Sequence, residues 1–185
     1  MEKACFAGGC FWCTASAFDG IAGVNKITSG YIGGHVDNPS YEHVCTGSTG
    51  HVEALEVEFD PDIISYWELL EIFFRQIDPT DAGGSFVDRG SQYDSAIFHH
   101  SRQQEAQARE MIRQIDAAGI FDRPVVTRLR PAMPFYPAES HHQNYHNTHA
   151  VQYKFYRLGS GRDSFIKKFW EDGPGKDLKL IRPSE

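Results

Sequence analysis

Strand-like and helix-like segments alternate along this chain of 185 residues, and the alternation predicts an α/β or α+β fold. A chain of this length suits one domain with a sizeable core, and 41% hydrophobic residues argue for a folded protein. No internal repeat, low-complexity tract or linker divides the sequence. We therefore expect a single domain over residues 1–185, with an irregular tail from about residue 172.

The expected strands span residues 3–7, 24–32, 51–59, 95–98 and 125–129. The third strand alternates clearly, which is typical of a strand with one buried face. Glu53 shares its face with Leu55 and Val57, whereas Glu56 lies on the opposite face. We therefore expect Glu53 to be buried among apolar side chains.

The expected helices span residues 10–18, 64–77, 138–149 and 163–171, together with one that follows Ser101 and runs through Ala118. Ser65 and Glu68 form a capping box for the second helix, and Gly119 ends the one that begins after Ser101. Residues 131–137 contain three prolines and cannot form a regular helix. Residues 33–50 and 78–93 are long polar loops, a kind that often carries function.

Charge and hydropathy argue against two classes of partner. The formal net charge is −7 and no basic run is present, so a nucleic-acid partner is not expected. No apolar run approaches the ~20 residues that cross a bilayer, so no membrane association is expected. The first residues lack the basic and apolar segments of a secretory signal, which predicts a cytoplasmic protein.

Cys10 and Cys13 flank Phe11 and Trp12 directly after a pair of glycines. Such a pair can be redox-active or half of a metal site; the plainer alternative is two small buried side chains. At the start of a helix, free backbone N–H groups and the helix dipole favour the thiolate. Cys10 is then the better placed nucleophile, with Cys13 one turn away and within reach for a disulfide.

A zinc site is the alternative interpretation of this pair. A cluster of histidines supplies candidate ligands: His141, His142, His146 and His149. His142 and His146 have helical i, i+4 spacing and would complete a Cys2His2 set with Cys10 and Cys13. Structural zinc motifs usually keep their ligand pairs close in sequence, however, and here most of the chain separates them.

Glu53 and three loop residues are further candidates. Burial raises a carboxyl pKa, and a neutral Glu53 beside a thiolate could protonate an oxygen. An inward glutamate paired with Arg or Lys is an equally good interpretation. Tyr41 and Tyr93 could be packing residues with wet hydroxyls, and Asp88 could be a turn residue beside Gly90.

The motifs together resemble the A-type peptide methionine sulfoxide reductases. The matching segments are residues 9–13 (GCFWC), 30–34 (GYIGG), 39–41 (PSY), 44–53 (VCTGSTGHVE), 88–97 (DRGSQYDSAI), 142–145 (HQNY) and 153–157 (YKFYR). The resemblance covers about residues 3 to 171. It implies an α+β two-layer sandwich with a mixed sheet, a ferredoxin-like core with extra helices and long loops, and no metal or organic cofactor.

The resemblance implies a catalytic domain that reduces methionine S-sulfoxide, free or in peptides and proteins, to methionine. Cys10 would attack the sulfoxide sulfur and become a sulfenic acid, while Glu53 would protonate the oxygen. The other implied site residues are Tyr41 and Tyr93 as hydroxyls that bind the oxygen, Phe11 and Trp12 as the apolar wall for the S-methyl group, and Asp88 as the group that organises Cys10 and a tyrosine.

The resemblance also bears on how the oxidised enzyme is recycled. Many members carry resolving cysteines near a C-terminal tail, but no cysteine follows Cys45 here. A position that is often glycine in such members is Cys13, so we expect a Cys10–Cys13 disulfide that thioredoxin reduces. Cys45 is a second candidate and Cys5 is expected to be structural. A general thiol–disulfide oxidoreductase fits Glu53 poorly, because disulfide exchange has no oxygen to protonate.

Overall fold

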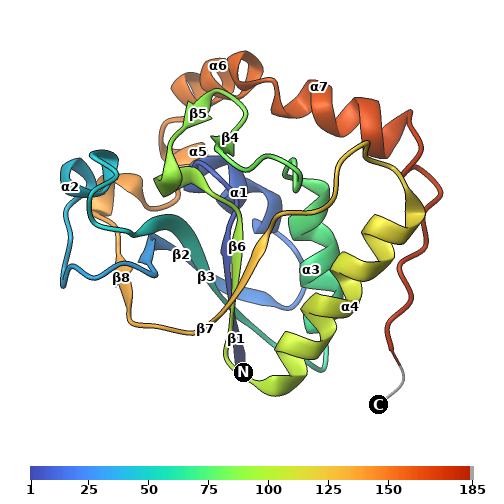
Figure 1. The fold of residues 1–185 in the computed structure, drawn as a ribbon. Coiled ribbons are helices and arrows are strands. Elements are labelled where there is room, and N and C mark those ends of the chain that lie inside the picture. The colour runs from blue at the N-terminus through green and yellow to red at the C-terminus, as the bar shows by residue number, and fades with distance from the viewer. Residues whose placement is uncertain (184–185) are drawn as a thin grey trace.

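A six-stranded mixed sheet forms the centre of the molecule in the computed structural model, which describes residues 1–183 (Figure 1). Its strands, in spatial order, are β7 (Arg128–Pro131), β6 (Ala96–His99), β1 (Glu2–Ala7), β3 (Val52–Phe59), β2 (Val24–Ile32) and β8 (Phe135–Pro137). Only β6 and β7 run parallel, and the other neighbours are antiparallel. With helices packed on this sheet, the predicted α+β class is confirmed.

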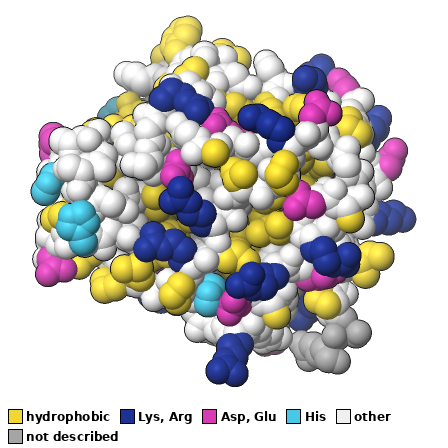
Figure 2. Space-filling view, viewed as in Figure 1, with side chains coloured by type: hydrophobic (Ala, Val, Ile, Leu, Met, Phe, Trp, Pro, Cys, Tyr) yellow, Lys and Arg dark blue, Asp and Glu magenta, His cyan; other side chains and the backbone are white. Residues whose placement is uncertain are grey.

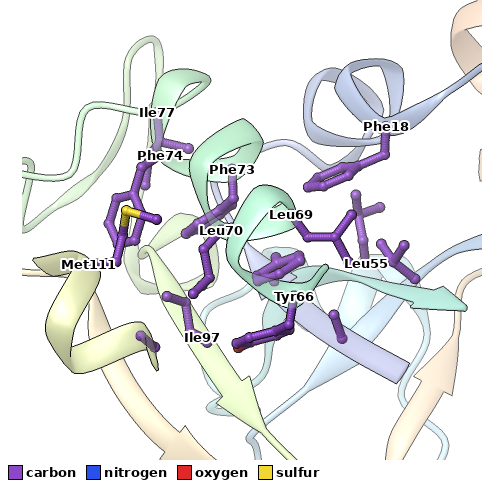
Figure 3. Packing of buried hydrophobic residues seen from close by; sticks show 14 of the residues in the cluster. Phe18, Leu55, Tyr66, Leu69, Leu70, Phe73, Phe74, Ile77, Ile97 and Met111 are labelled. Carbon is purple, nitrogen blue, oxygen red and sulfur yellow. The ribbon is translucent and has the colours of Figure 1, made fainter. Parts of the chain in front are cut away.

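Helices α1 (Phe11–Phe18), α3 (Tyr66–Arg75) and α4 (Arg102–Ala118) cover one face of the sheet. Phe6 of β1 lies at the centre of this core, its ring stacked against Phe18 at 5.6 Å and Phe73 at 5.0 Å between centroids. Figure 3 shows how the aromatic and aliphatic side chains of α3 fill the space above the strands. Burying each such side chain stabilises the fold by about 1.5–3 kcal/mol.

The opposite face of the sheet carries a smaller apolar cluster made by the alternate residues of the same strands. Its buried members are Cys5, Ala7, Ile32, Val52, Ala54, Ala96 and Phe98. Glu53 therefore points toward the helices with Leu55, whereas Val52 and Ala54 point away. The predicted alternation of this strand is confirmed.

Most expected elements are present, with shifts of one or two residues at their ends. The predicted capping box at Ser65 and Glu68 is formed, and Gly119 ends α4 in the left-handed conformation with φ of 61°. The expected strand 125–129 begins only at Arg128, where it joins β6. Residues 172–183 contain neither helix nor strand; the tail's last residues, 184–185, lie outside the described chain.

The long loops contain short elements that their composition did not predict. These are α2 (Tyr41–Cys45), the β4 (Gly84–Ser85) and β5 (Asp88–Arg89) hairpin, and the 3-10 turn η1 (Ser91–Tyr93). A strand, β8, also occupies part of the proline-rich stretch, pairing at the sheet edge with β2. Of these elements, η1 packs on β3 and the β4–β5 hairpin lies against Gly9, just before α1.

The C-terminal third differs most from the sequence prediction. The expected helix 138–149 is wrong, because Asn144 has a positive φ of 52° and separates the turn η2 (Ser140–His142) from α5 (Tyr145–Thr148). A helix that was not expected, α6 (Ala150–Ser160), follows. The expected helix 163–171 is divided into α7 (Arg162–Ile166) and a π-helical turn, η3 (Lys167–Glu171).

Across residues 1–183 no helix combines the length and hydrophobicity that crossing a bilayer requires. On the face drawn in Figure 2, lysine and arginine side chains are dispersed among aspartates and glutamates. The cytoplasmic location stays a prediction.

Candidate active site

Cys10 lies at the junction of β1 and α1, where a tight glycine turn sets its position. Gly9 has a φ of +81°, and a Cβ at this residue would lie 2.3 Å from the Cβ of Ser85. Cys10 is the residue before α1, and its carbonyl accepts the backbone N–H groups of Cys13 and Thr14 at 3.1 and 3.2 Å. The glycine is therefore needed to bring the β4–β5 hairpin against the cysteine.

The thiols of Cys10 and Cys13 are free, buried and hydrogen-bonded to each other. Burial raises the pKa of Cys10, to which the hydrogen bond to Cys13 adds. The hydrogen bond from Cys10 lowers the pKa of Cys13, and the charges of Arg162 and Arg157 lower it further. Burial therefore opposes the effect of the helix dipole at Cys10, whereas the nearby cations act on Cys13; the role of Cys10 as the nucleophile stays a prediction.

Glu53 faces the start of α1 from β3. Its side chain is buried, and its Oε2 accepts the backbone N–H of Phe11 at 3.0 Å. Burial raises its pKa to about 8 against the opposing effect of that hydrogen bond. Within residues 1–183 no Lys or Arg lies within ion-pair distance of its carboxyl group. Glu53 is therefore an uncharged acid at neutral pH, and the ion-pair alternative is not observed.

Tyr41 and Tyr93 converge from the two long loops, at the start of α2 and the end of η1. Burial raises the pKa of both hydroxyls, and ionisation of Glu53 would act in the same direction on each. Both hydroxyls also hydrogen-bond to the half-buried Cys45 thiol. These hydroxyls therefore remain protonated donors near Glu53, and Cys45 lies beside them.

Asp88 lies on β5, close to Cys10 through a third tyrosine. The hydroxyl of Tyr156, from α6, donates to Asp88 Oδ2 and also hydrogen-bonds to the Cys10 thiol. Burial raises the pKa of Asp88, although this hydrogen bond opposes the effect. Asp88 is thus linked to Cys10 by Tyr156.

An aromatic wall borders the site. The ring of Trp12 stacks on Tyr145 with centroids 3.9 Å apart, and Phe11 packs against His142 at 5.3 Å. His142 also contacts Trp12 and Tyr41 at 5.7 and 4.4 Å, and neither of its ring nitrogens has a hydrogen-bond partner within the described chain. Burial lowers the pKa of His142, so this wall is uncharged at neutral pH.

Several residues of this region had no role in the reductase site that the sequence predicted. Glu139 accepts the hydroxyl of Tyr31 at 2.8 Å and the backbone N–H of Tyr41 at 2.9 Å, which fixes the start of α2. His142 and Tyr156 lie within motifs that matched the family, and this match was the signal that could have found them. Glu139 had no such signal, because its partners are more than ninety residues away in sequence.

The zinc alternative is not supported by the arrangement of these side chains. His142 belongs to the turn η2 and packs against the aromatic wall. His146 belongs to α5, and its Nε2 lies 3.0 Å from Asp19 Oδ2. Across the described residues no group of three or more His, Cys, Asp or Glu side chains is arranged to hold a metal ion. The expected i, i+4 ligand pair fails because Asn144 interrupts the helix.

Comparison with known proteins agrees with this geometry. A protein-family model described as "Peptide methionine sulfoxide reductase" matches residues 2–173 of this chain. The chain belongs to the peptide methionine sulfoxide reductase family. The resemblance predicted from the motifs is thereby confirmed, and with it the prediction that the chain is an oxidoreductase.

Individual relatives and structures of this family match most of the chain. "Peptide methionine sulfoxide reductase MsrA" of Bacillus licheniformis is 50% identical over 169 residues, which are 91% of this chain and 93% of the relative. The Bacillus subtilis protein of the same name is also 50% identical, covering 91% and 96%. The structure of methionine sulfoxide reductase A of Corynebacterium diphtheriae is 30% identical with a TM-score of 0.71, covering 81% and 76%.

Proposed function

We propose that this enzyme reduces methionine S-sulfoxide, free or within peptides and proteins, to methionine. The observation that carries the proposal is the position of the Cys10 thiol between a protonated, buried Glu53 and a second thiol, Cys13. The names of the Bacillus relatives support the substrate class. The uncharged aromatic wall formed by Phe11 and Trp12 suits the S-methyl group of the substrate.

In the first step the sulfur of Cys10 attacks the sulfoxide sulfur. Glu53 protonates the oxygen as the S–O bond breaks, and Tyr41 and Tyr93 donate hydrogen bonds to that oxygen. The oxygen passes to the Cys10 sulfur, so methionine leaves reduced by two electrons and Cys10 becomes a sulfenic acid. Asp88 acts indirectly by orienting Tyr156 on Cys10.

In the second step Cys13 attacks the Cys10 sulfenic acid, which forms a disulfide and releases water. Thioredoxin then reduces this disulfide. Mxr1 of Saccharomyces cerevisiae, a structural neighbour at 22% identity and a TM-score of 0.52, has been crystallised in complex with Trx2, which supports a reductant of this class. Cys45 remains the second candidate for the resolving role, since it lies beside both tyrosines.

The experiment that tests this function is a single turnover without reductant. The enzyme is mixed with each sulfoxide epimer, and released methionine and remaining free thiols are counted. Methionine from the S epimer alone, with the loss of two thiols per chain, is the expected result. Release from the R epimer, or no methionine from either epimer, would contradict the proposal.

A further inference from the structure

Arg162 is a buried cation whose hydrogen-bond partners are all neutral. The residue is 1% exposed, and its Nη2 donates to the carbonyl oxygen of Gly8 at 3.2 Å while Nη1 donates to that of Gln76. Its guanidinium carbon lies 4.7 Å from the centre of the Phe86 ring. No carboxylate is within ion-pair distance of it in the part of the chain that the structure describes. A buried charge without a counter-ion is costly, so an anion nearby would stabilise this arrangement.

Arg157 approaches the same place from α6. Its Nη1 lies 3.4 Å from the carbonyl oxygen of Cys13, 3.2 Å from Ser16 Oγ and 3.1 Å from the hydroxyl of Tyr153. Its Nη2 donates to Gln76 Oε1 at 3.1 Å, and Nε pairs with the exposed Asp163 at 2.7 Å. The side chain of Gln76 and its carbonyl thus hold the two guanidinium groups together beside α1.

Both guanidinium groups lie at the start of α1, Arg157 on the carbonyl of Cys13 and Arg162 on that of Gly8, and the Cys13 thiol is the ionisable group on which both charges act. Both charges lower its pKa, after the larger contribution of the hydrogen bond from Cys10, and the Tyr153 hydroxyl adds to them against the opposing effect of burial. At Cys10 burial is instead the largest influence and raises the pKa, and ionisation of Glu53 or of Cys13 would raise it further. The charge of Arg162 also lowers the pKa of Asp88 on β5, but the Asp88 carboxyl accepts a hydrogen bond from the Tyr156 hydroxyl.

We propose that Arg157 and Arg162 are positioning residues that hold Cys13 as a thiolate and thereby set the rate of disulfide formation. This inference rests on the proposed function, in which Cys13 resolves the Cys10 sulfenic acid. In that step an electron pair of the Cys13 sulfur forms the S–S bond, and the S–O bond of the sulfenic acid breaks. The hydroxide that leaves takes one proton and becomes water, so Cys13 is oxidised as the Cys10 sulfur is reduced. Only the ionised fraction of Cys13 can react in this way.

The test follows both steps of a single turnover across a range of pH in Arg162→Gln, Arg157→Gln and wild-type enzyme. Methionine release reports the attack by Cys10, and the loss of two thiols reports the disulfide. We expect methionine release to stay within a few-fold of wild type. Thiol loss is expected to be several-fold slower at about pH 6 in the variants, because a smaller fraction of Cys13 is ionised when its pKa rises. Above about pH 9 the difference disappears, because Cys13 is ionised in both enzymes.

A second measurement addresses the ionisation of Cys13 itself. In a Cys10→Ser background, alkylation by iodoacetamide is followed against pH and located on Cys13 by mass spectrometry. We expect the pH midpoint of Cys13 alkylation to rise when Arg162→Gln or Arg157→Gln is added. With Arg162→Lys, which keeps the charge, the midpoint should return toward the starting value. Arg109→Gln, which removes an exposed arginine paired with Glu105 on α4, is the matched control.

The outcomes separate this inference from the proposed function. If Cys13→Ser still loses two thiols in a turnover, the resolving assignment is wrong. If Cys13→Ser stops that loss while both arginine variants keep the wild-type pH profile, only the role of the arginines is overturned. Because Arg162 is fully buried, an Arg162→Gln protein that does not fold leaves the decision to Arg157→Gln, whose side chain is 16% exposed. An unchanged profile in that variant overturns the proposal.

Discussion

Two sides of Cys10 have opposite electrostatics, although both lie beside the start of α1. On one side Glu53 is buried without a cation, which keeps a proton on its carboxyl group. On the other side Arg157 and Arg162 act on Cys13, which favours the loss of a proton. A single helix start can therefore support both a protonated acid and an ionised thiol, because different elements supply the surrounding charges.

The two sides also come from different parts of the chain. Glu53 belongs to the central strand β3, whereas Arg157 and Arg162 belong to α6 and α7 at the C-terminal end. Figure 1 shows α6 and α7 lying across the same end of the molecule as α1 and the β4–β5 hairpin. Substitutions can therefore change one side without removing the other, and the predictions use this separation.

The largest effect is expected at the residue that both sides share. Cys10→Ser should abolish methionine release and disulfide formation together, since a serine hydroxyl is a far weaker nucleophile at neutral pH. Cys45→Ser should keep both reactions, because its thiol is not needed in the proposed cycle. Methionine release measured in a single turnover checks both variants, and loss of thioredoxin-supported turnover in Cys45→Ser would favour Cys45 as the resolving residue.

The second largest effect is expected for Cys13→Ser, which should separate methionine release from the recycling of Cys10. Cys13→Ser should release about one methionine per enzyme and then stop, because the acid side is intact while no thiol resolves the sulfenic acid. Methionine per chain, measured with and without thioredoxin, shows the difference. Normal cycling of Cys13→Ser with thioredoxin is the result that the proposed recycling step does not allow.

Removing the acid should slow the chemical step and leave the other side unchanged. Glu53→Gln cannot donate the proton and is expected to reduce the rate of methionine release by about 10²–10⁴-fold. Glu56→Gln, three residues away on the opposite face of β3, should be nearly silent. Equal effects of the two substitutions would refute the role of the buried acid.

The acid side was largely predictable from sequence, and the basic side was not. Alternation in β3 is local, so it indicated the burial of Glu53 without any tertiary information. The hydrogen bond of Arg157 to the Cys13 carbonyl joins residues 144 positions apart, and no local pattern reports such a pairing. Helix α6 was also missed, because His149 supplies no side-chain cap and Phe155 and Leu158 are exposed.

A smaller catalytic effect is expected from the tyrosine hydroxyls. Tyr41→Phe and Tyr93→Phe each remove one donor to the sulfoxide oxygen, and the loss of one such donor costs up to about 10²–10³-fold where it acts alone. Because two hydroxyls share the oxygen here, we expect about tenfold for each variant and a larger loss for the double variant. The rate of methionine release checks this, and Tyr136→Phe, whose exposed hydroxyl binds Asp37, is the matched control. A double variant no slower than either single variant would contradict shared binding of the oxygen.

The smallest difference concerns stability, for which the two sides have opposite pH dependence. The folded state raises the pKa of Glu53 to about 8, so it keeps a proton that the unfolded chain releases from about pH 4.5 upward. The stability contributed by this proton is full at low pH and is lost as the pH rises toward about 8, a change of a few kcal/mol, on the order of 1.4 kcal/mol per pKa unit. The lowered pKa of Cys13 acts in the other direction, since the stability that the Cys13 thiolate contributes is lost as the pH falls.

Glu53→Gln should remove only the pH dependence that comes from Glu53. Urea unfolding should therefore show this variant gaining stability relative to wild type between about pH 5 and pH 8. Parallel pH profiles for Glu53→Gln and wild type would show that the carboxyl is already ionised in the folded protein, and the contrast between the two sides of Cys10 would then be absent.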